Sequence, residues 1–213
     1  MSKKRYPPRV PRTAHGFRAQ ELRNVPRGAW WVRQWLNAID AMRLGARAGR
    51  GKVYAERGQV IDLRVSGSHV DATVAGGRSE PYSVKVDFAT FPSDGGGLPA
   101  RLGVMSVGRI LAGEMPTTVD EQFSIAGVSP YPTSGADHFW CSCPDWSKPC
   151  KHIAAVLYLL GDALIRDPSL LLRLRGVDMA QDAESVGTSI PLWKGGMRLS
   201  DALDGIYRRT GAR

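Results

Sequence analysis

Cysteine is scarce in this sequence, since Cys141, Cys143 and Cys150 are the only three in 213 residues. So few cysteines exclude the disulfide framework that stabilises small secreted domains. Long hydrophobic runs are also missing, because no apolar stretch reaches the roughly 18–20 residues that cross a bilayer. The first residues lack the apolar segment of a secretory signal. We therefore expect a cytoplasmic protein that does not act at a membrane.

Acidic residues are scarce in the first quarter of the chain. Residues 1–57 contain 14 lysines and arginines but only three aspartates and glutamates, whereas the rest of the chain is nearly balanced. The net charge of +9 therefore arises in the N-terminal part. Excess positive charge favours a polyanionic partner, so the composition indicates nucleic acid.

The familiar patterns of catalytic sites are absent as well. Gly51-Lys52 is followed by Val53, where the phosphate-binding loop of nucleotide hydrolases requires Ser or Thr. No Ser/His/acid arrangement is detectable, and the sequence lacks the His-x-Glu and Pro-Cys-x-x-Cys pattern of zinc deaminases. We expect a protein that is not an enzyme.

The three cysteines lie close to a histidine in the pattern Cys141-x-Cys143-x6-Cys150-x-His152. On an extended strand Cys141 and Cys143 point to the same side. Cys150 and His152 share a metal only if Cys150 ends a loop and His152 lies in the first turn of a helix. Three thiolates and an imidazole suit tetrahedral Zn²⁺. The sequence therefore predicts a strand, a loop and a helix folded around zinc.

Two alternatives compete with this interpretation. The cysteines could be unligated core residues, or His138 could replace His152 as the fourth ligand, although the spacing favours His152. Four protein ligands leave no position for water, so we expect a structural zinc rather than a catalytic one. Lys148 and Lys151 flank Cys150, and we expect both to offset the negative charge of the thiolates.

This motif, followed by an apolar helix, resembles the SWIM zinc finger. The string Cys-Ser-Cys-Pro-Asp-Trp…Pro-Cys-Lys-His-Ile-Ala-Ala-Val is similar to bacterial members of that family, and a looser likeness runs from about residue 28 to 176. The resemblance implies binding to DNA or to proteins. It also implies partnership with a SWI/SNF-type helicase-like ATPase, either fused to the finger protein or encoded nearby.

The basic half offers two candidate phosphate-binding segments. Residues 1–27 combine cations and prolines with few residues to bury, which predicts a basic disordered arm that binds phosphate, docks a protein or is simply solvated. In residues 44–60, Gly49 and Gly51 either hold phosphate through backbone amides or form a turn between helices. We predict nucleic-acid contacts at six cations: Arg47, Arg50, Lys52, Arg57, Lys148 and Lys151.

Periodicity predicts the remaining elements. Apolar residues recur at helical spacing over 30–42, and we expect Trp35 of this segment to pack in the core rather than to stack on bases. Apolar and polar residues alternate over 60–88, with turns near Gly67-Ser68 and Gly76-Gly77, which indicates a three-stranded antiparallel meander. Helices are expected around 99–113 and 118–126.

We therefore predict an α+β protein in which an N-terminal amphipathic helix and a three-stranded meander precede helices that carry a structural zinc finger. The predicted parts are a basic arm (1–27), a helix-plus-sheet domain (28–96), a helical region (97–176) with the finger at about 137–165, and a C-terminal extension of unassigned structure (177–213). The expected function is non-catalytic nucleic-acid binding, DNA rather than RNA, together with a helicase-like ATPase. The alternative is an adaptor whose finger docks the ATPase without touching nucleic acid.

Overall fold

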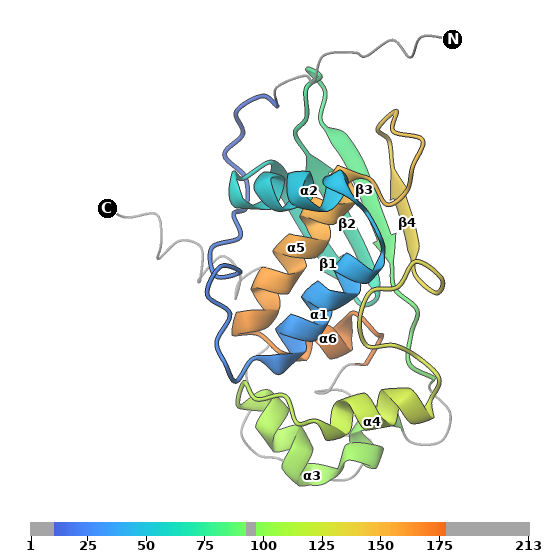
Figure 1. Cartoon of the computed structure of the whole chain (residues 1–213). Coiled ribbons are helices and arrows are strands. Elements are labelled where there is room, and N and C mark those ends of the chain that lie inside the picture. Colours follow the sequence, from blue (N-terminus) through green and yellow to red (C-terminus); the bar gives the residue numbers. More distant parts are fainter. Residues whose placement is uncertain (1–10, 93–96, 178–213) are drawn as a thin grey trace.

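A computed structural model describes residues 11–92 and 97–177 of the chain (Figure 1). The first ten residues of the predicted arm and nearly all of the predicted C-terminal extension lie outside this described part. The elements confirm an α+β fold and follow one another as α1 (Trp30–Ala41), α2 (Ala46–Glu56), β1 (Val60–Ser66), β2 (His69–Val74), β3 (Tyr82–Asp87), α3 (Gly97–Leu111), α4 (Thr118–Ile125), β4 (His138–Cys141), α5 (Lys151–Arg166) and α6 (Ser169–Arg173). None of the described helices is both long and apolar enough to span a membrane.

The sheet has four antiparallel strands in the order β1-β2-β3-β4, which are the three strands of the predicted meander and the strand predicted for the finger. The alternating segment forms β1, β2 and β3, and the strand of the predicted finger is β4. It pairs with β3 so that Cys141 lies opposite Val84 and His138 opposite Asp87. The alternation of apolar and polar residues in a strand shows which face is buried, but it does not show which distant strand pairs with it. The predicted three-stranded meander is confirmed, whereas its pairing with the finger strand was not predicted.

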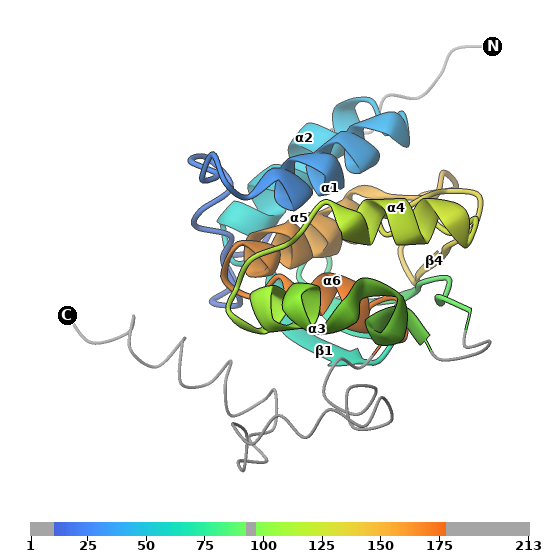
Figure 2. The ribbon, with the colours of Figure 1, turned by 90° about the horizontal axis from the view of Figure 1, so that it is seen from below.

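Helix α5 is the centre of the molecule. It contacts α1, α2 and α6 as well as strands β1, β3 and β4, and Figure 2 shows it lying between the pair α1/α2 and the sheet. Buried residues occur on every side of it, from His152 to Leu164. A helix that is apolar all round belongs inside a protein, and the central position of α5 matches that pattern.

Small residues allow the surrounding helices to approach α5 closely. A Cβ on Gly51 of α2 would lie 2.5 Å from the Cβ of Ala154, and a Cβ on Gly161 would lie 2.9 Å from the ring of Trp35. Gly49 and Gly51 are therefore part of a helix and form neither a phosphate-binding loop nor a turn, so both interpretations of this segment were wrong. Their amides lie inside the hydrogen-bonded helix, where phosphate cannot use them. Trp35 is buried, as predicted.

Residues 11–27 lie against the body of the protein instead of forming a disordered arm. Phe17 makes a single β-bridge with Val60. The buried carboxylate of Asp162 accepts hydrogen bonds from the backbone amides of Gln20 (2.9 Å) and Glu21 (2.7 Å), and Leu22 enters the core. Composition alone missed this docking because the partners of Leu22 and of the two amides lie far away in the sequence.

The predicted boundary near residue 96 does not divide the core. One hydrophobic cluster contains residues of α1, α2 and the meander together with Ile153 to Leu164 of α5. The finger helix is therefore the common packing surface for the elements before it. Helices α3 and α4 sit at one end of the molecule (Figure 1), joined to the rest by contacts such as the hydrogen bond from Trp30 Nε1 to the Met115 carbonyl.

Candidate metal centre

The predicted strand, loop and helix of the finger are present. Cys141 is the last residue of β4, and Cys143 follows two positions later in the loop. Cys150 caps α5 with an extended backbone, and His152 lies in the first turn of that helix. This change of backbone conformation between Cys150 and His152 lets both side chains face one point, as the spacing required.

The four side chains converge as a tetrahedral site requires. Their ligand atoms all lie within 4.8 Å of one another, and all four residues are buried. His152 Nδ1 is 3.8 Å from the sulfurs of both Cys141 and Cys150. Bonds of about 2.3 Å to sulfur and about 2.1 Å to nitrogen would place such atoms about 3.6 Å apart around zinc. Within residues 11–92 and 97–177 no other group of His, Cys, Asp and Glu is arranged to hold a metal. His138, the alternative ligand, is exposed.

Two hydrogen-bond donors lie close to the sulfurs, where they stabilise negative charge. Lys148 Nζ lies 3.7 Å from Cys143 Sγ and donates a hydrogen bond to the Cys141 carbonyl at 2.9 Å. The Cys143 amide lies 3.5 Å from Cys141 Sγ. Lys148 is therefore placed to offset the negative charge of a thiolate, as predicted. Lys151 instead turns away from the sulfurs and places its ammonium over the ring of Tyr54.

The thiols have unequal acidity before a metal binds. A hydrogen bond from the Cys141 thiol lowers the pKa of Cys150 to about 3. The same interaction, with burial, raises the pKa of Cys141 above its ordinary range, and burial raises the pKa of Cys143. Cys150 is thus the first thiolate to form and the first available to an incoming cation.

The imidazole of His152 is fixed by its neighbours. Its ring lies 4.5 Å from that of Tyr82, with an interplanar angle of 32°, and 5.6 Å from that of Tyr54. Gly76 leaves room for the Tyr82 ring that packs on the imidazole, since a Cβ there would stand 2.4 Å from Tyr82 Cε2. Nε2 is buried and has no hydrogen-bond partner among the described residues. Zinc at Nδ1 places the ring proton on this nitrogen.

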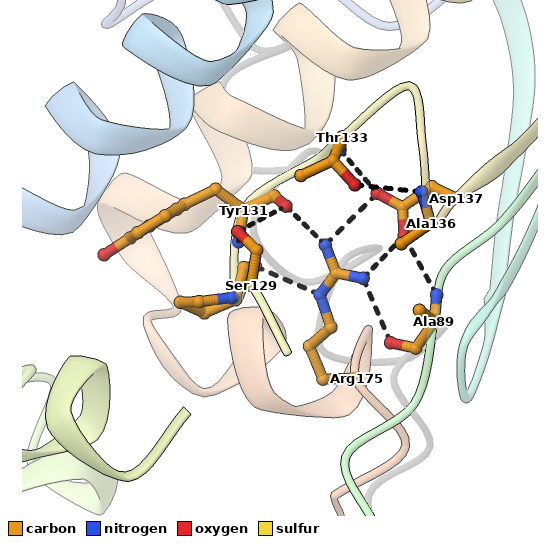
Figure 3. Close-up of polar contacts among 8 residues, drawn as sticks. Ala89, Ser129, Tyr131, Thr133, Ala136, Asp137 and Arg175 are labelled. Carbon is orange, nitrogen blue, oxygen red and sulfur yellow. Dashed lines mark hydrogen bonds and ion pairs between the residues drawn. The ribbon is translucent and has the colours of Figure 1, made fainter. Parts of the chain in front are cut away.

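A buried ion pair between Asp137 and Arg175 lies beside the finger (Figure 3). Asp137 immediately precedes β4, and Arg175 follows α6. The pair therefore joins the segment before the finger strand to the segment after α6. Arg175 is 1% exposed and Asp137 0%, and their closest contact is 2.6 Å. Arg175 also donates to the carbonyls of Ala89 and Tyr131, and Asp137 accepts a hydrogen bond from the amide of Thr133.

This pair was not predicted from the sequence. Arg175 is in the core, whereas the nearby Arg173 contacts Asp167 at 2.6 Å. Asp137 and Arg175 are 38 positions apart and match no motif. The only signal was that Arg175 follows a run of leucines, where an unpaired charge would be costly to bury.

The six cations predicted to contact nucleic acid lie on α2 and beside the zinc site. Arg50 and Arg57 are exposed, and Arg47 and Lys52 are partly buried on the same helix. Lys148 and Lys151 are engaged near the metal site as described above. Arg47 connects the two groups, because its Nε lies 3.3 Å from Asp145 Oδ2 in the loop between Cys143 and Cys150.

Comparison with known proteins agrees with this geometry. The SWIM zinc finger family model matches residues 135–161, a segment that contains all four ligands. The chain therefore carries a SWIM zinc finger, and the protein binds zinc. It is also similar to the uncharacterized protein Rv2102 of Mycobacterium tuberculosis (strain ATCC 25618 / H37Rv), with 34% identity over 175 residues. That alignment covers 80% of this chain and 63% of the relative, so the chain spans less than two thirds of that protein's length. No solved structure gives a significant match.

Proposed function

We propose that this protein is a non-catalytic zinc protein that binds nucleic acid, DNA in preference to RNA, through the phosphate backbone. The observation that carries the proposal is a cationic surface beside the zinc loop, formed by Arg47, Arg50 and Arg57 of α2 and its C-cap. The net charge of +9 supports it, and the resemblance to SWIM fingers favours DNA.

Helical geometry separates the cations of α2 into two groups. Arg50 and Arg57 are seven residues apart, so they lie on one face at a spacing of about 10 Å. Lys52 is about 200° away from Arg50 around the axis and points to another side. Lys148 is held by the Cys141 carbonyl and Lys151 by Tyr54. We therefore assign the main phosphate contacts to Arg50 and Arg57, with Arg47 at the edge of the zinc loop.

Zinc has a structural part in this proposal. The metal fixes both ends of the loop between Cys143 and Cys150, and Asp145 in that loop contacts Arg47 of α2. Four buried protein ligands fill a tetrahedral site, which leaves no coordination position for a substrate. The proposal is therefore non-catalytic and gives zinc the task of placing the loop beside the arginines.

The test is a salt series with labelled DNA and RNA, comparing the wild type with an Arg50→Ala/Arg57→Ala double variant. Each lost phosphate contact lowers the log–log slope by roughly 0.7–0.9, so the double variant should lose about 1.4–1.8. A charge-matched control replaces Arg64 and Lys85 on the sheet, whose side chains are 80% and 61% exposed. The control should keep the wild-type slope.

If both double variants lost the same amount of salt slope, the positive charges would bind nucleic acid without a defined surface. Absence of wild-type binding at about 150 mM salt would refute direct nucleic-acid binding. Deletion of residues 1–10, which contain Lys3, Lys4, Arg5 and Arg9, separates their contribution from that of α2.

A second candidate function is that of an adaptor for a SWI/SNF-type helicase-like ATPase. Apolar side chains at one end of the molecule favour it, since Met105, Leu111 and Ile125 on α3 and α4 are exposed. Exposed apolar residues are frequent at protein interfaces. Under this proposal the ATPase binds α3 and α4 and leaves the arginines of α2 accessible.

The adaptor proposal is tested by measuring binding to such an ATPase in the presence of nuclease. A Met105→Ser/Ile125→Ser variant should lose ATPase binding and keep its zinc content. The Arg50→Ala/Arg57→Ala variant is the matched control and should bind the ATPase as the wild type does. Loss of ATPase binding in the arginine variant, with normal binding in the Met105→Ser/Ile125→Ser variant, would place the ATPase contact on α2.

A further inference from the structure

Trp146 is the most exposed large apolar side chain in the described part of the chain, at 91%. It lies in the loop between the zinc ligands Cys143 and Cys150. A tryptophan side chain gains more than most others from leaving water, because it can bury roughly 150–250 Å². Tryptophan is enriched among the residues that contribute most to binding energy, so an indole left in solvent on a compact loop is a candidate contact for a partner.

The loop holds the backbone of Trp146 in a defined place. Zinc ligands fix the chain on both sides of Trp146. The preceding residue, Asp145, accepts a hydrogen bond from the amide of Ser147 at 3.2 Å and contacts Arg47 at 3.3 Å. Lys148, two residues later, is tied to the Cys141 carbonyl. Because the backbone around Trp146 is already ordered, a ligand that covers the ring meets little additional entropy cost.

The charges near this indole are mostly positive. Arg47 and Lys148 lie on the two sides of the loop, Arg50 is one helical turn from Arg47, and Lys151 follows the loop at the start of α5. Asp145 is the one acidic residue between Cys143 and Cys150. A flat aromatic face with cations around it complements a base that is attached to a phosphodiester backbone. A purely apolar partner would offer no counter-charge to Arg50, which is exposed.

We infer that Trp146 stacks on an unpaired base, so the ligand at the finger is single-stranded nucleic acid. In a duplex both faces of each base are covered by neighbouring pairs, and an indole on a short loop has no base face to contact. In a single strand the bases are accessible, and stacking on an aromatic side chain contributes about 1–3 kcal/mol per base. This inference rests on the proposed function and adds the form of nucleic acid that the finger recognises.

The test compares zinc-loaded full-length wild type with Trp146→Ala and Trp146→Phe. The probes are a labelled 12-nucleotide DNA strand, the RNA strand of the same sequence, and the corresponding DNA duplex. Trp146→Ala should weaken binding to single strands by about 5- to 150-fold, the equivalent of one stacked base. Duplex binding and the salt slope should stay unchanged, because the indole neutralises no phosphate. Trp146→Phe should retain most of the single-strand affinity.

Ile61→Ala is the matched control, since Ile61 is 43% exposed on strand β1. It should bind all three probes as the wild type does, and zinc content confirms that each variant keeps its finger intact. Loss of single-strand and duplex binding to the same degree in Trp146→Ala would overturn the inference. Unchanged binding to all probes would overturn it too. Both outcomes leave phosphate binding by α2 standing, whereas a wild type that binds no probe at about 150 mM salt refutes the proposed function itself.

Discussion

Arg175 and Asp137 form a fully buried ion pair that joins the residue before β4 to the residues after α6. Two hydrogen bonds link the guanidinium to the carboxylate, and backbone carbonyls satisfy the other donors. The guanidinium carbon also lies 5.1 Å from the centre of the Phe88 ring. The ion pair therefore ties the segment that enters the finger to the segment that follows α6.

We expect Arg175→Ala to lower the free energy of unfolding by about 3–5 kcal/mol, because it leaves the Asp137 carboxylate buried without its counter-charge. Arg175→Lys should recover only part of this loss, since an ammonium cannot reproduce the planar set of donors. Chemical denaturation measures both. Arg173→Ala is the control, because its partly exposed pair with Asp167 should contribute about 1 kcal/mol or less. Similar losses for the two alanine variants would contradict the assigned role.

The close approach of α2 to α5 predicts opposite effects for two glycines of one helix. Gly51→Ala places a Cβ 2.5 Å from that of Ala154 and should cost about 1–3 kcal/mol through overpacking. Gly49→Ala meets no atom within 4 Å and should stabilise the helix by about 0.5–1 kcal/mol. Thermal denaturation distinguishes them, and stabilisation by both substitutions would mean that α2 and α5 are not in tight contact.

Loss of a zinc ligand should affect the whole described core. We expect Cys150→Ser to lose zinc and several kcal/mol of stability, because metal binding is coupled to folding in structural zinc sites. Since α5 contacts both the sheet and the preceding helices, unfolding should remain one transition at a lower temperature. Metal analysis, with melting followed by circular dichroism and tryptophan fluorescence, tests this expectation.

His138→Ala is the control for the ligand variant, because His138 lies outside the four-residue cluster. It should keep stoichiometric zinc and a nearly unchanged melting temperature. Full zinc occupancy in Cys150→Ser, or zinc loss in His138→Ala, would overturn the ligand assignment. Separate transitions for the two optical probes would instead indicate that the finger unfolds independently.

Zinc binding should release protons. Cys150, whose pKa is lowered to about 3, is already a thiolate at neutral pH, whereas Cys141 and Cys143, whose pKa values are raised, still hold their protons. Zinc must displace about two protons between pH 7 and 8, so its apparent affinity should rise with pH and fall on acidification. Calorimetry in buffers with different ionisation enthalpies measures the number released. A value near three would contradict the lowered pKa of Cys150, and a value near zero would contradict the raised pKa values of Cys141 and Cys143.

The elements that the sequence predicted well are those encoded by local patterns. The finger was readable because Cys141, Cys143, Cys150 and His152 are close in the chain, and their spacing alone dictates a strand, a loop and a helix. The first helix and the meander were readable because a regular period reports which face is buried. For both, the predictions agree with the structure to within a few residues.

The features that escaped prediction depend on partners distant in sequence. Gly51 looks like a loop residue until Ala154 is seen beside it, because helix packing overrides the low helix propensity of glycine. Residues 11–27 look unstructured until Asp162 is seen to bind their amides. Arg175 looks like a surface cation until Asp137 is found next to it. In each case the sequence shows one half of an interaction, and only the folded chain brings in the other half.

The finger of this protein is not a portable module. A peptide of residues 135–161 would keep all four ligands, but β4 would lose its hydrogen bonds to β3 and α5 would lose the helices that cover it. Much of the buried surface of α5 would then be exposed to water, which would favour aggregation over folding. Grafting the ligand pattern onto another scaffold would therefore fail unless the meander and α2 were transferred with it.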